Sequence, residues 1–362
     1  MHLPRATTTL ITAGLLGAVF GLLRFPQEVS QAVREGLSMC TDTLLPTLFP
    51  FFVLSALVVK TGLSDRLGHW LSSIMGPLFH LPGTCAAALV LGFVGGYPTG
   101  ARTAAALYQS GRCTREEARR LLSFCCACSP AFLLGAVGNG LFGDSRYGLT
   151  LLGVHWIAAI LSGVLLNQSA PIPAKIETGP LTGPAQPFFS AFSDSVKDSF
   201  RAMLDLFAFV LCFAAVGRLI ELSGIPCRLA ELLPLSHENS RALLMGLLDM
   251  PRWVMSLTAG GIRERMVLSS LLLAWGGLSI HCQICSILHA SGLSPVCFLK
   301  GKVLHAILSA LLMAGLSGSC MAQCLLGGCF CLLFPWRWIK KWWKKDGSYS
   351  IMGTAKKGSC HE

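Results

Sequence analysis

The sequence is poor in charged side chains. Asp, Glu, Lys and Arg make up 13% of its 362 residues, whereas soluble domains carry about 25%. Apolar residues make up 53%, and the mean hydropathy is +0.61. Such a composition excludes a disordered chain, a small disulfide scaffold and an ordinary soluble enzyme. We therefore expect a membrane protein that crosses the bilayer several times.

The sequence also lacks the short motifs that carry enzyme chemistry. It has no P-loop, no GxSxG, no HExxH and no glycine-rich nucleotide fingerprint that follows a strand. We predict that the chain is not an enzyme and has neither catalytic residues nor a cofactor. We expect no cleavable signal peptide, because Arg24-Phe25-Pro26 follows the first apolar run instead of a small-residue cleavage site.

Long runs without charge define the candidate spans. They cover residues 6–23, 43–59, 71–101, 121–143, 147–174, 266–299 and 303–336. Because a spanning helix needs about 20 apolar residues, the longest runs are long enough for a helix, a bend and part of another. We predict an all-α, polytopic helical membrane protein with broken or re-entrant helices.

The net charge of +11 is concentrated at the C-terminal end. Residues 336–362 hold seven basic and two acidic side chains, with four tryptophans interleaved. Tryptophan at the headgroup level with basic residues beyond it marks a cytoplasmic exit from the membrane. We therefore predict a protein of the cell membrane whose C-terminal tail lies in the cytoplasm and contacts anionic lipid. We predict no nucleic-acid partner.

Sixteen cysteines raise the question of a metal site. Most lie inside apolar runs, where a thiol packs as a small apolar group. Cys282 with Cys285, and Cys320 with Cys324, have spacings that put both thiols on one helical face. No set of carboxylates accompanies them, so we predict no metal site and keep a metal-ion permease as the weakest functional alternative.

The chain divides at a proline-rich stretch. Residues 168–187 hold five prolines and two glycines without a helical period, as expected of an extended linker. The predicted organisation is an N-terminal helix with an interfacial segment (1–34), a first repeat (35–167), the linker (168–190), a second repeat (191–318), and a last span with the tail (319–362).

The repeats are inferred from glycines in register. Gly62 and Gly224 end similar apolar runs 162 residues apart, and Gly95-Gly96 is matched by Gly276-Gly277 at a distance of 181. The same distance separates Gly111 from Gly292. Many transporters are built from two such repeats, with the site at their interface. Coincidence in so apolar a chain is the alternative.

The first glycine pair lies in the most informative segment. Gly95-Gly96-Tyr97-Pro98-Thr99-Gly100-Ala101-Arg102 is deep in the membrane by hydropathy, yet combines helix breakers with a charge. Unwound backbone in lipid is tolerated only where protein or water satisfies it, and transporters use it to hold polar solutes. Close helix packing, with Arg102 reaching toward the interface, is the alternative.

The second glycine pair precedes a cluster of polar side chains. Ser279 and Gln283 follow Gly276-Gly277 and are four residues apart, so they share one helical face. A carboxamide offers a donor and an acceptor and suits a nucleobase or another neutral polar solute. We predict His281 to be a hydrogen-bonded core residue.

Three further polar positions complete the prediction. Ser129 precedes a proline that breaks the run 121–143, and Asn139 follows in the same run. Asp249 is either an acid inside the membrane, able to couple transport to cations, or a loop charge paired with Arg252.

At the glycine-tyrosine-proline motif the chain resembles the YlbJ-type sporulation integral membrane proteins of spore-forming Firmicutes, within the nucleoside-recognition Gate-domain group. The resemblance covers residues 35–315 and also draws on segments 44–62, 129–138 and 276–283. It implies two Gate repeats and a multi-pass membrane protein needed for spore formation. A glutamate motif of that group is replaced here by the segment ending in Asp249.

We therefore expect a transporter or permease-like component for a small, nucleoside-like solute. The alternative is a membrane scaffold that binds another sporulation membrane protein or itself. The predicted solute-binding residues are Gly95, Gly96, Tyr97, Pro98, Gly100, Arg102, Ser129, Asn139, Asp249, Gly276, Gly277, Ser279 and Gln283.

Overall fold

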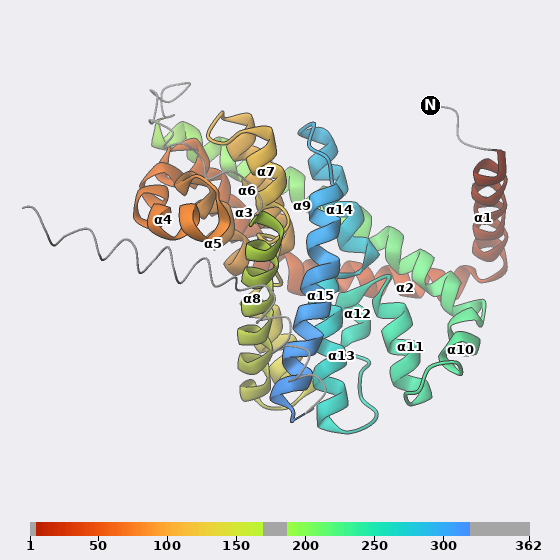
Figure 1. Ribbon diagram of the computed structural model, residues 1–362. Coiled ribbons are helices and arrows are strands. Elements are labelled where there is room, and N and C mark those ends of the chain that lie inside the picture. The colour runs from red at the N-terminus through yellow and green to blue at the C-terminus, as the bar shows by residue number, and fades with distance from the viewer. Residues whose placement is uncertain (1–4, 169–186, 319–362) are drawn as a thin grey trace, which may run out of the picture.

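The computed structural model describes residues 5–168 and 187–318, which are helical without strands (Figure 1). The predicted all-helical fold is confirmed. The linker at 169–186, the Cys320 group and the tail at 319–362 lie outside the described residues. The elements are α1 (Arg5–Arg24), α2 (Pro26–Met39), η1 (Cys40–Leu44), α3 (Leu45–Lys60), α4 (Leu63–Phe79), η2 (Gly83–Cys85), α5 (Ala86–Gly95), α6 (Tyr97–Gln109), α7 (Arg115–Leu121), η3 (Phe132–Leu141), α8 (Ser145–Asn167), α9 (Phe188–Leu222), α10 (Ile225–Ala230), α11 (His237–Gly246), α12 (Met250–Val254), α13 (Ile262–Trp275), α14 (Gly277–Ala290) and α15 (Val296–Leu316).

Five of the described helices are long and apolar enough to cross a membrane. They are Pro26–Lys60, Ser145–Asn167, Phe188–Leu222, Ile262–Ala290 and Val296–Leu316, and a bent pair, Leu63–Phe79 with Gly83–Gly95, would make six. Helix α15 begins in the uncharged run 266–299 and continues through Lys300 and Lys302 into the next run. The run 121–143 is broken at the predicted place, because an irregular segment ends at Ser129 and η3 follows.

Two 35-residue helices form a unit that we call the arm. One consists of α2, the π-helical turn η1 and α3, and the other is α9. They run antiparallel, since Lys60 at one end of α3 pairs with Asp198 near the start of α9 at 2.7 Å, while Gly36 lies against Ala214. The arm has its own apolar cluster of Leu48, Phe52, Ala202, Met203 and Leu206.

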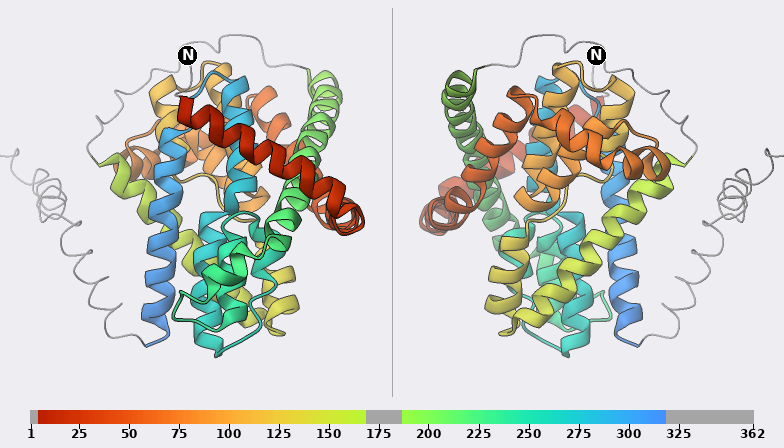
Figure 2. Two further views of the ribbon diagram at one scale, coloured as in Figure 1. Left: turned by 90° about the vertical axis from the view of Figure 1, so that its right-hand side faces the viewer. Right: turned by 90° about the vertical axis from the view of Figure 1, so that its left-hand side faces the viewer.

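The remaining helices from α4 to α15, apart from α9, form a second unit that we call the core. Helices α8 and α15 lie on the flank opposite α9 in both views of Figure 2. A buried, irregular segment, residues 122–129, runs inside the core. Three glycines let helices approach its backbone, because a Cβ on Gly92, Gly100 or Gly301 would lie within 2.3 Å of a carbonyl oxygen of Ser123 or Cys125.

Both predicted helix breaks are present. Gly96 (φ 95°) separates α5 from α6, and Gly276 (φ 89°) separates α13 from α14. Such positive φ angles are open to glycine and strained for other residues. Gly62 and Gly224 also share this conformation, and each follows one of the two helices of the arm.

Candidate functional site

The two broken helices meet at their breaks. The hydroxyl of Tyr97, the first residue of α6, donates a hydrogen bond to the carbonyl of Leu273 in the last turn of α13. A Cβ on Gly276 would lie 3.5 Å from the Tyr97 ring. The end of α13 is thus joined to the start of α6, which places unwound backbone from both halves of the chain at one point.

The start of α14 is held from the other side. The amides of Leu278 and Ser279 donate to the carbonyls of Leu247 and Leu248, both at 2.9 Å. A Cβ on Gly277 would lie 2.7 Å from the Met250 nitrogen. Two of the free amides at a helix start are therefore satisfied by the loop between α11 and α12, and glycine is required for this approach.

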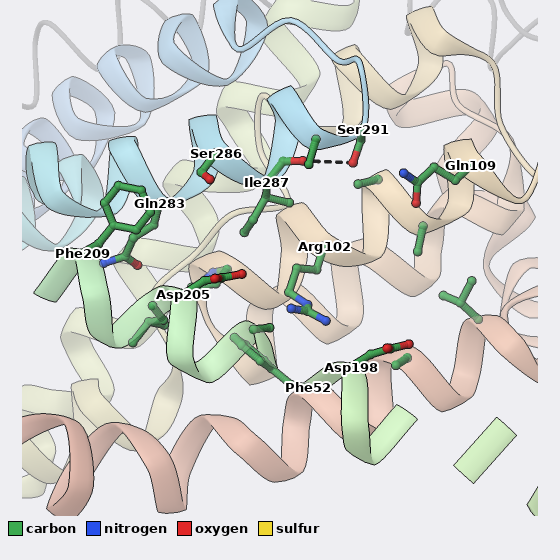
Figure 3. Close-up of a pocket in the computed structure, with 18 of the residues that line it drawn as sticks. Phe52, Arg102, Gln109, Asp198, Asp205, Phe209, Gln283, Ser286, Ile287 and Ser291 are labelled. Atoms are coloured by element: carbon green, nitrogen blue, oxygen red, sulfur yellow. Dashed lines mark hydrogen bonds between the residues drawn. The ribbon is translucent and has the colours of Figure 1, made fainter. Parts of the chain in front are cut away.

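A cavity of about 440 Å³, which we call the charged cavity, opens on one side of the breaks. Figure 3 shows the Arg102 side chain of α6 within it, with Asp198 and Asp205 of α9 close by. The guanidinium carbon lies 4.9 Å from the centre of the Phe52 ring, a cation–π distance. The Arg102 side chain thus faces the cavity and the arm.

The charges of this cavity are balanced. Lys60 pairs with Asp198 at 2.7 Å, and Arg102 feels the negative charges of Asp198 and Asp205. Opposite them lie the polar side chains of Ser286 on α14 and Ser291 just after its end (Figure 3). A polar solute without net charge would therefore find donors and acceptors here without leaving an isolated charge.

A second cavity of about 300 Å³, which we call the Ser129 cavity, lies on the other side of the breaks. Its lining is mainly apolar, and its polar side chains come from Thr43, Thr47, Tyr97, Ser129, Asp249, Ser279 and Gln283. The Gln283 amide nitrogen donates to the Ser279 hydroxyl at 3.4 Å, which confirms that both residues share one helical face.

Three residues line both cavities. They are Pro98 at the start of α6, Leu206 in the middle of α9, and Gln283 on α14. One wall of each cavity is formed by the arm and the other by the core. The two cavities therefore follow the boundary between arm and core, and a layer of Pro98, Leu206 and Gln283 separates them.

Eight of the predicted residues line a cavity: Gly96, Tyr97, Pro98, Arg102, Ser129, Asp249, Ser279 and Gln283. Four glycines act as packing positions instead, because a Cβ on Gly95, Gly100, Gly276 or Gly277 would meet neighbouring atoms. Asn139 lies on the exposed face of η3 and outside both cavities. His281 is buried and its Nε2 is 2.9 Å from the Trp275 carbonyl oxygen, as expected of a satisfied core residue.

Asp249 faces the Ser129 cavity from the residue before α12. Its expected loop partner, Arg252, donates instead to Glu35 of α2 at 3.1 Å. Burial raises the pKa of Asp249 to about 6, which the charge of Arg252 only partly offsets. Its carboxyl group is therefore set to change charge near neutral pH while facing the cavity.

The predicted site did not include the residues that the arm contributes to the charged cavity. Lys60 and Asp205 stand at the edges of uncharged stretches, as charges at span ends do, and Asp198 lies in a charged stretch beside Lys197. A signal was present in the four charges Asp194, Asp198, Arg201 and Asp205, whose spacings of four, three and four residues put them along one helix face. Within residues 5–168 and 187–318, no three metal-ligating side chains gather in one place.

Comparisons with known proteins agree with the resemblance read from the motifs. Residues 42–144 match the family model Gate, described as nucleoside recognition. The chain is 26% identical over 338 residues to the sporulation integral membrane protein YlbJ of Bacillus subtilis, covering 86% of this chain and 83% of the relative. The resemblance to this group is thereby confirmed, and the chain is a multi-pass membrane protein.

The fold is similar to that of a concentrative nucleoside transporter. The structure of a doubly substituted CNTnw in an outward-facing state matches with a TM-score of 0.53 and 16% identity, covering 86% of both chains. This likeness concerns the architecture, and the solute of this chain does not follow from it.

Proposed function

We propose that this relative of YlbJ transports a small polar, nucleoside-like solute across the cell membrane, with its C-terminal tail in the cytoplasm. The observation that carries the proposal is the pair of cavities on opposite sides of the helix breaks, divided by Pro98, Leu206 and Gln283. Two half-open chambers with a thin partition are what a transporter needs in order to expose its solute to one side at a time.

The chemistry of the Ser129 cavity supports the choice of solute. Its apolar walls suit the face of a nucleobase, and the Gln283 carboxamide can donate to and accept from a base edge. The Asp249 carboxylate accepts hydrogen bonds from hydroxyl groups such as those of a sugar. A volume of about 300 Å³ is at the lower end of the range for small-molecule sites.

The two-repeat organisation, 35–167 and 191–318, belongs to the same proposal. It is supported by glycines with positive φ angles that pair in register, Gly62 with Gly224, Gly96 with Gly277, and Gly111 with Gly292. In this arrangement each repeat supplies one long arm helix and one broken helix. Movement between arm and core would then open the two cavities in turn.

A non-transporting scaffold is the second candidate. It is supported by the close glycine contacts of α5, α6 and α15 with residues 122–129, which show that several glycines serve packing. Such a protein would take part in spore formation by binding another membrane protein and would not need an open path for a solute.

Uptake of tritiated uridine by proteoliposomes separates these candidates. Replacing Gln283 with Ala removes hydrogen bonds worth about 1–3 kcal/mol, so we expect uptake at low uridine concentration to fall by about 5–150-fold. Gln31, which is exposed on α2, provides the control Gln31→Ala. Normal uptake by Gln283→Ala would contradict the site, and no saturable nucleoside uptake by the wild type would contradict the transport proposal.

Leu206 tests the partition itself. Leu206→Trp fills the layer between the cavities, so we expect it to stop uptake. Leu206→Ala widens the opening between the two cavities. Leu204, which is 51% exposed on the same helix, supplies the matched controls Leu204→Trp and Leu204→Ala. In the native host, deletion should lower the yield of heat-resistant spores, with rescue by the wild type but not by Gln283→Ala.

A further inference from the structure

A buried cluster of basic side chains lies behind the helix breaks. Lys302 of α15 is 2% exposed, although lysine is rarely buried without a partner carrying the opposite charge. In the part of the chain that the structure describes, no carboxylate lies within ion-pair distance of it. An ionisable side chain in a spanning helix is costly and points to a function.

Neutral groups surround the amino group of Lys302. Its Nζ lies 3.3 Å from the carbonyl oxygen of Cys126, 3.4 Å from Nδ1 of His305, and 4.6 Å from the centre of the Tyr97 ring. The three donors of an ammonium group match these three acceptors. No negative charge holds the proton on Lys302, so the group can exist in either charge state.

The hydrogen bonds define where the histidine protons lie. Nε2 of His305 is 2.9 Å from the His155 carbonyl oxygen and must donate to it, so Nδ1 of His305 is free to accept from Lys302. Nε2 of His155 accepts from the Cys128 amide at 2.9 Å, so its proton is on Nδ1. That buried nitrogen has no hydrogen-bond partner among the described residues.

The cluster is one residue layer away from the solute path. Tyr97 and Cys128 line the Ser129 cavity. The amino group of Lys302 contacts the Tyr97 ring and the carbonyl of Cys126, which is two residues before Cys128. Tyr97 in turn holds the end of α13 through the Leu273 carbonyl. The positive charge on Lys302 therefore acts on both helix breaks through one aromatic ring.

We propose that Lys302 and His305 form a buried proton-binding pair whose charge state sets the geometry of the two helix breaks and so couples solute movement to protons. In the protonated pair the proton leaves Nζ as its N–H bond breaks and joins Nδ1 of His305, which leaves a neutral amine and an imidazolium. Release of that proton from Nδ1 toward the Ser129 cavity then leaves both groups neutral. The neutral amine loses its attraction to the Tyr97 ring and holds the Cys126 carbonyl less strongly.

The ionisable groups that face the amino group are its own helix neighbour His305, Tyr97 from α6, His155 from α8, His281 from α14, and Cys125, Cys126 and Cys128 from the irregular segment. None of these groups is a carboxylate, so the pair is the place where a proton entering from the Ser129 cavity would reside. The coupling rests on the proposed transport, whereas proton binding by the pair does not.

The test begins without any solute. Side-chain nitrogen NMR of isotope-labelled lysine in the purified, detergent-solubilised protein is followed from about pH 6 to pH 10, with Lys302→Met identifying the Lys302 signal. His305→Gln keeps an acceptor toward Lys302 and a donor toward His155 but cannot bind the proton. We expect the Lys302 signal to titrate in this range and its midpoint to move by about one pH unit or more in His305→Gln.

Uptake of tritiated uridine under an imposed pH gradient then tests the coupling. We expect the gradient to stimulate the wild type and the stimulation to fall by about fivefold or more in His305→Gln. Lys300→Gln, an exposed position on the same helix, is expected to behave as the wild type. A Lys302 signal that stays charged throughout and ignores His305→Gln would overturn the proposal in favour of a fixed structural cation, whether or not uridine is transported.

Discussion

Replacing Gly301 with alanine tests the packing on which the site depends. A Cβ there would lie 1.9 Å from the Ser123 carbonyl oxygen, whereas ordinary contact begins at 3.4 Å. Helix α15 and the irregular segment would have to separate by about 1.5 Å. The bonds from Lys302 to Cys126 and from Ser162 to the Gly301 carbonyl, both 3.3 Å long, would break.

The cost follows from these two effects. Overpacking against rigid backbone costs about 1–3 kcal/mol and each lost hydrogen bond about 1 kcal/mol, so we expect about 3–5 kcal/mol in all. The apparent melting temperature in detergent, measured from the fraction that stays monodisperse after heating, should fall by about 5–15 °C.

Gly153 provides the matched control. It lies on α8, and a Cβ there has no neighbour within 4 Å. Alanine favours a helix over glycine by about 0.5–1 kcal/mol, so Gly153→Ala should be at least as stable as the wild type. If Gly301→Ala has the same melting temperature as Gly153→Ala, the close contact between α15 and Ser123 does not exist as described.

Three further predictions concern single groups. Because burial raises the pKa of Asp249 from 3.8 to about 6, the folded protein takes up a proton there before the unfolded chain does. The melting temperature should therefore rise as the pH falls from about 7 to 4. Asp249→Asn should remove the part of this rise that comes from Asp249. An Asp249→Asn variant with the same pH dependence as the wild type would contradict the burial of this acid. Tyr97→Phe leaves the Leu273 carbonyl without its donor and should cost about 1 kcal/mol in thermal unfolding, whereas an unchanged melting temperature would speak against the link between the breaks. The double variant Cys282→Ser with Cys285→Ser should leave uridine uptake unchanged, because a nucleoside site does not use these thiols. Loss of a metal-dependent uptake in this variant would instead favour the metal-ion permease.

Much of the architecture was already determined by the sequence. Low charge and long apolar runs can only be accommodated as helices in a bilayer, since each buried backbone group must find its partner within its own segment. The glycines at Gly96 and Gly276 had to break their helices, because the conformations found there are strained for any residue with a Cβ. The spacing of Ser279 and Gln283 placed them on one face for the same local reason.

Tertiary structure alone decided which polar groups meet. Asp198 and Asp205 face Arg102 only because α9 packs antiparallel to α3, and no local pattern encodes that pairing. Lys302 looked like the boundary between two spans, and only the carbonyl of Cys126 and the ring of Tyr97 give it a place in the interior. Helix breaks depend on the conformational freedom of single residues and can be predicted along the chain, whereas cavities and buried charges depend on contacts between residues about a hundred or more positions apart.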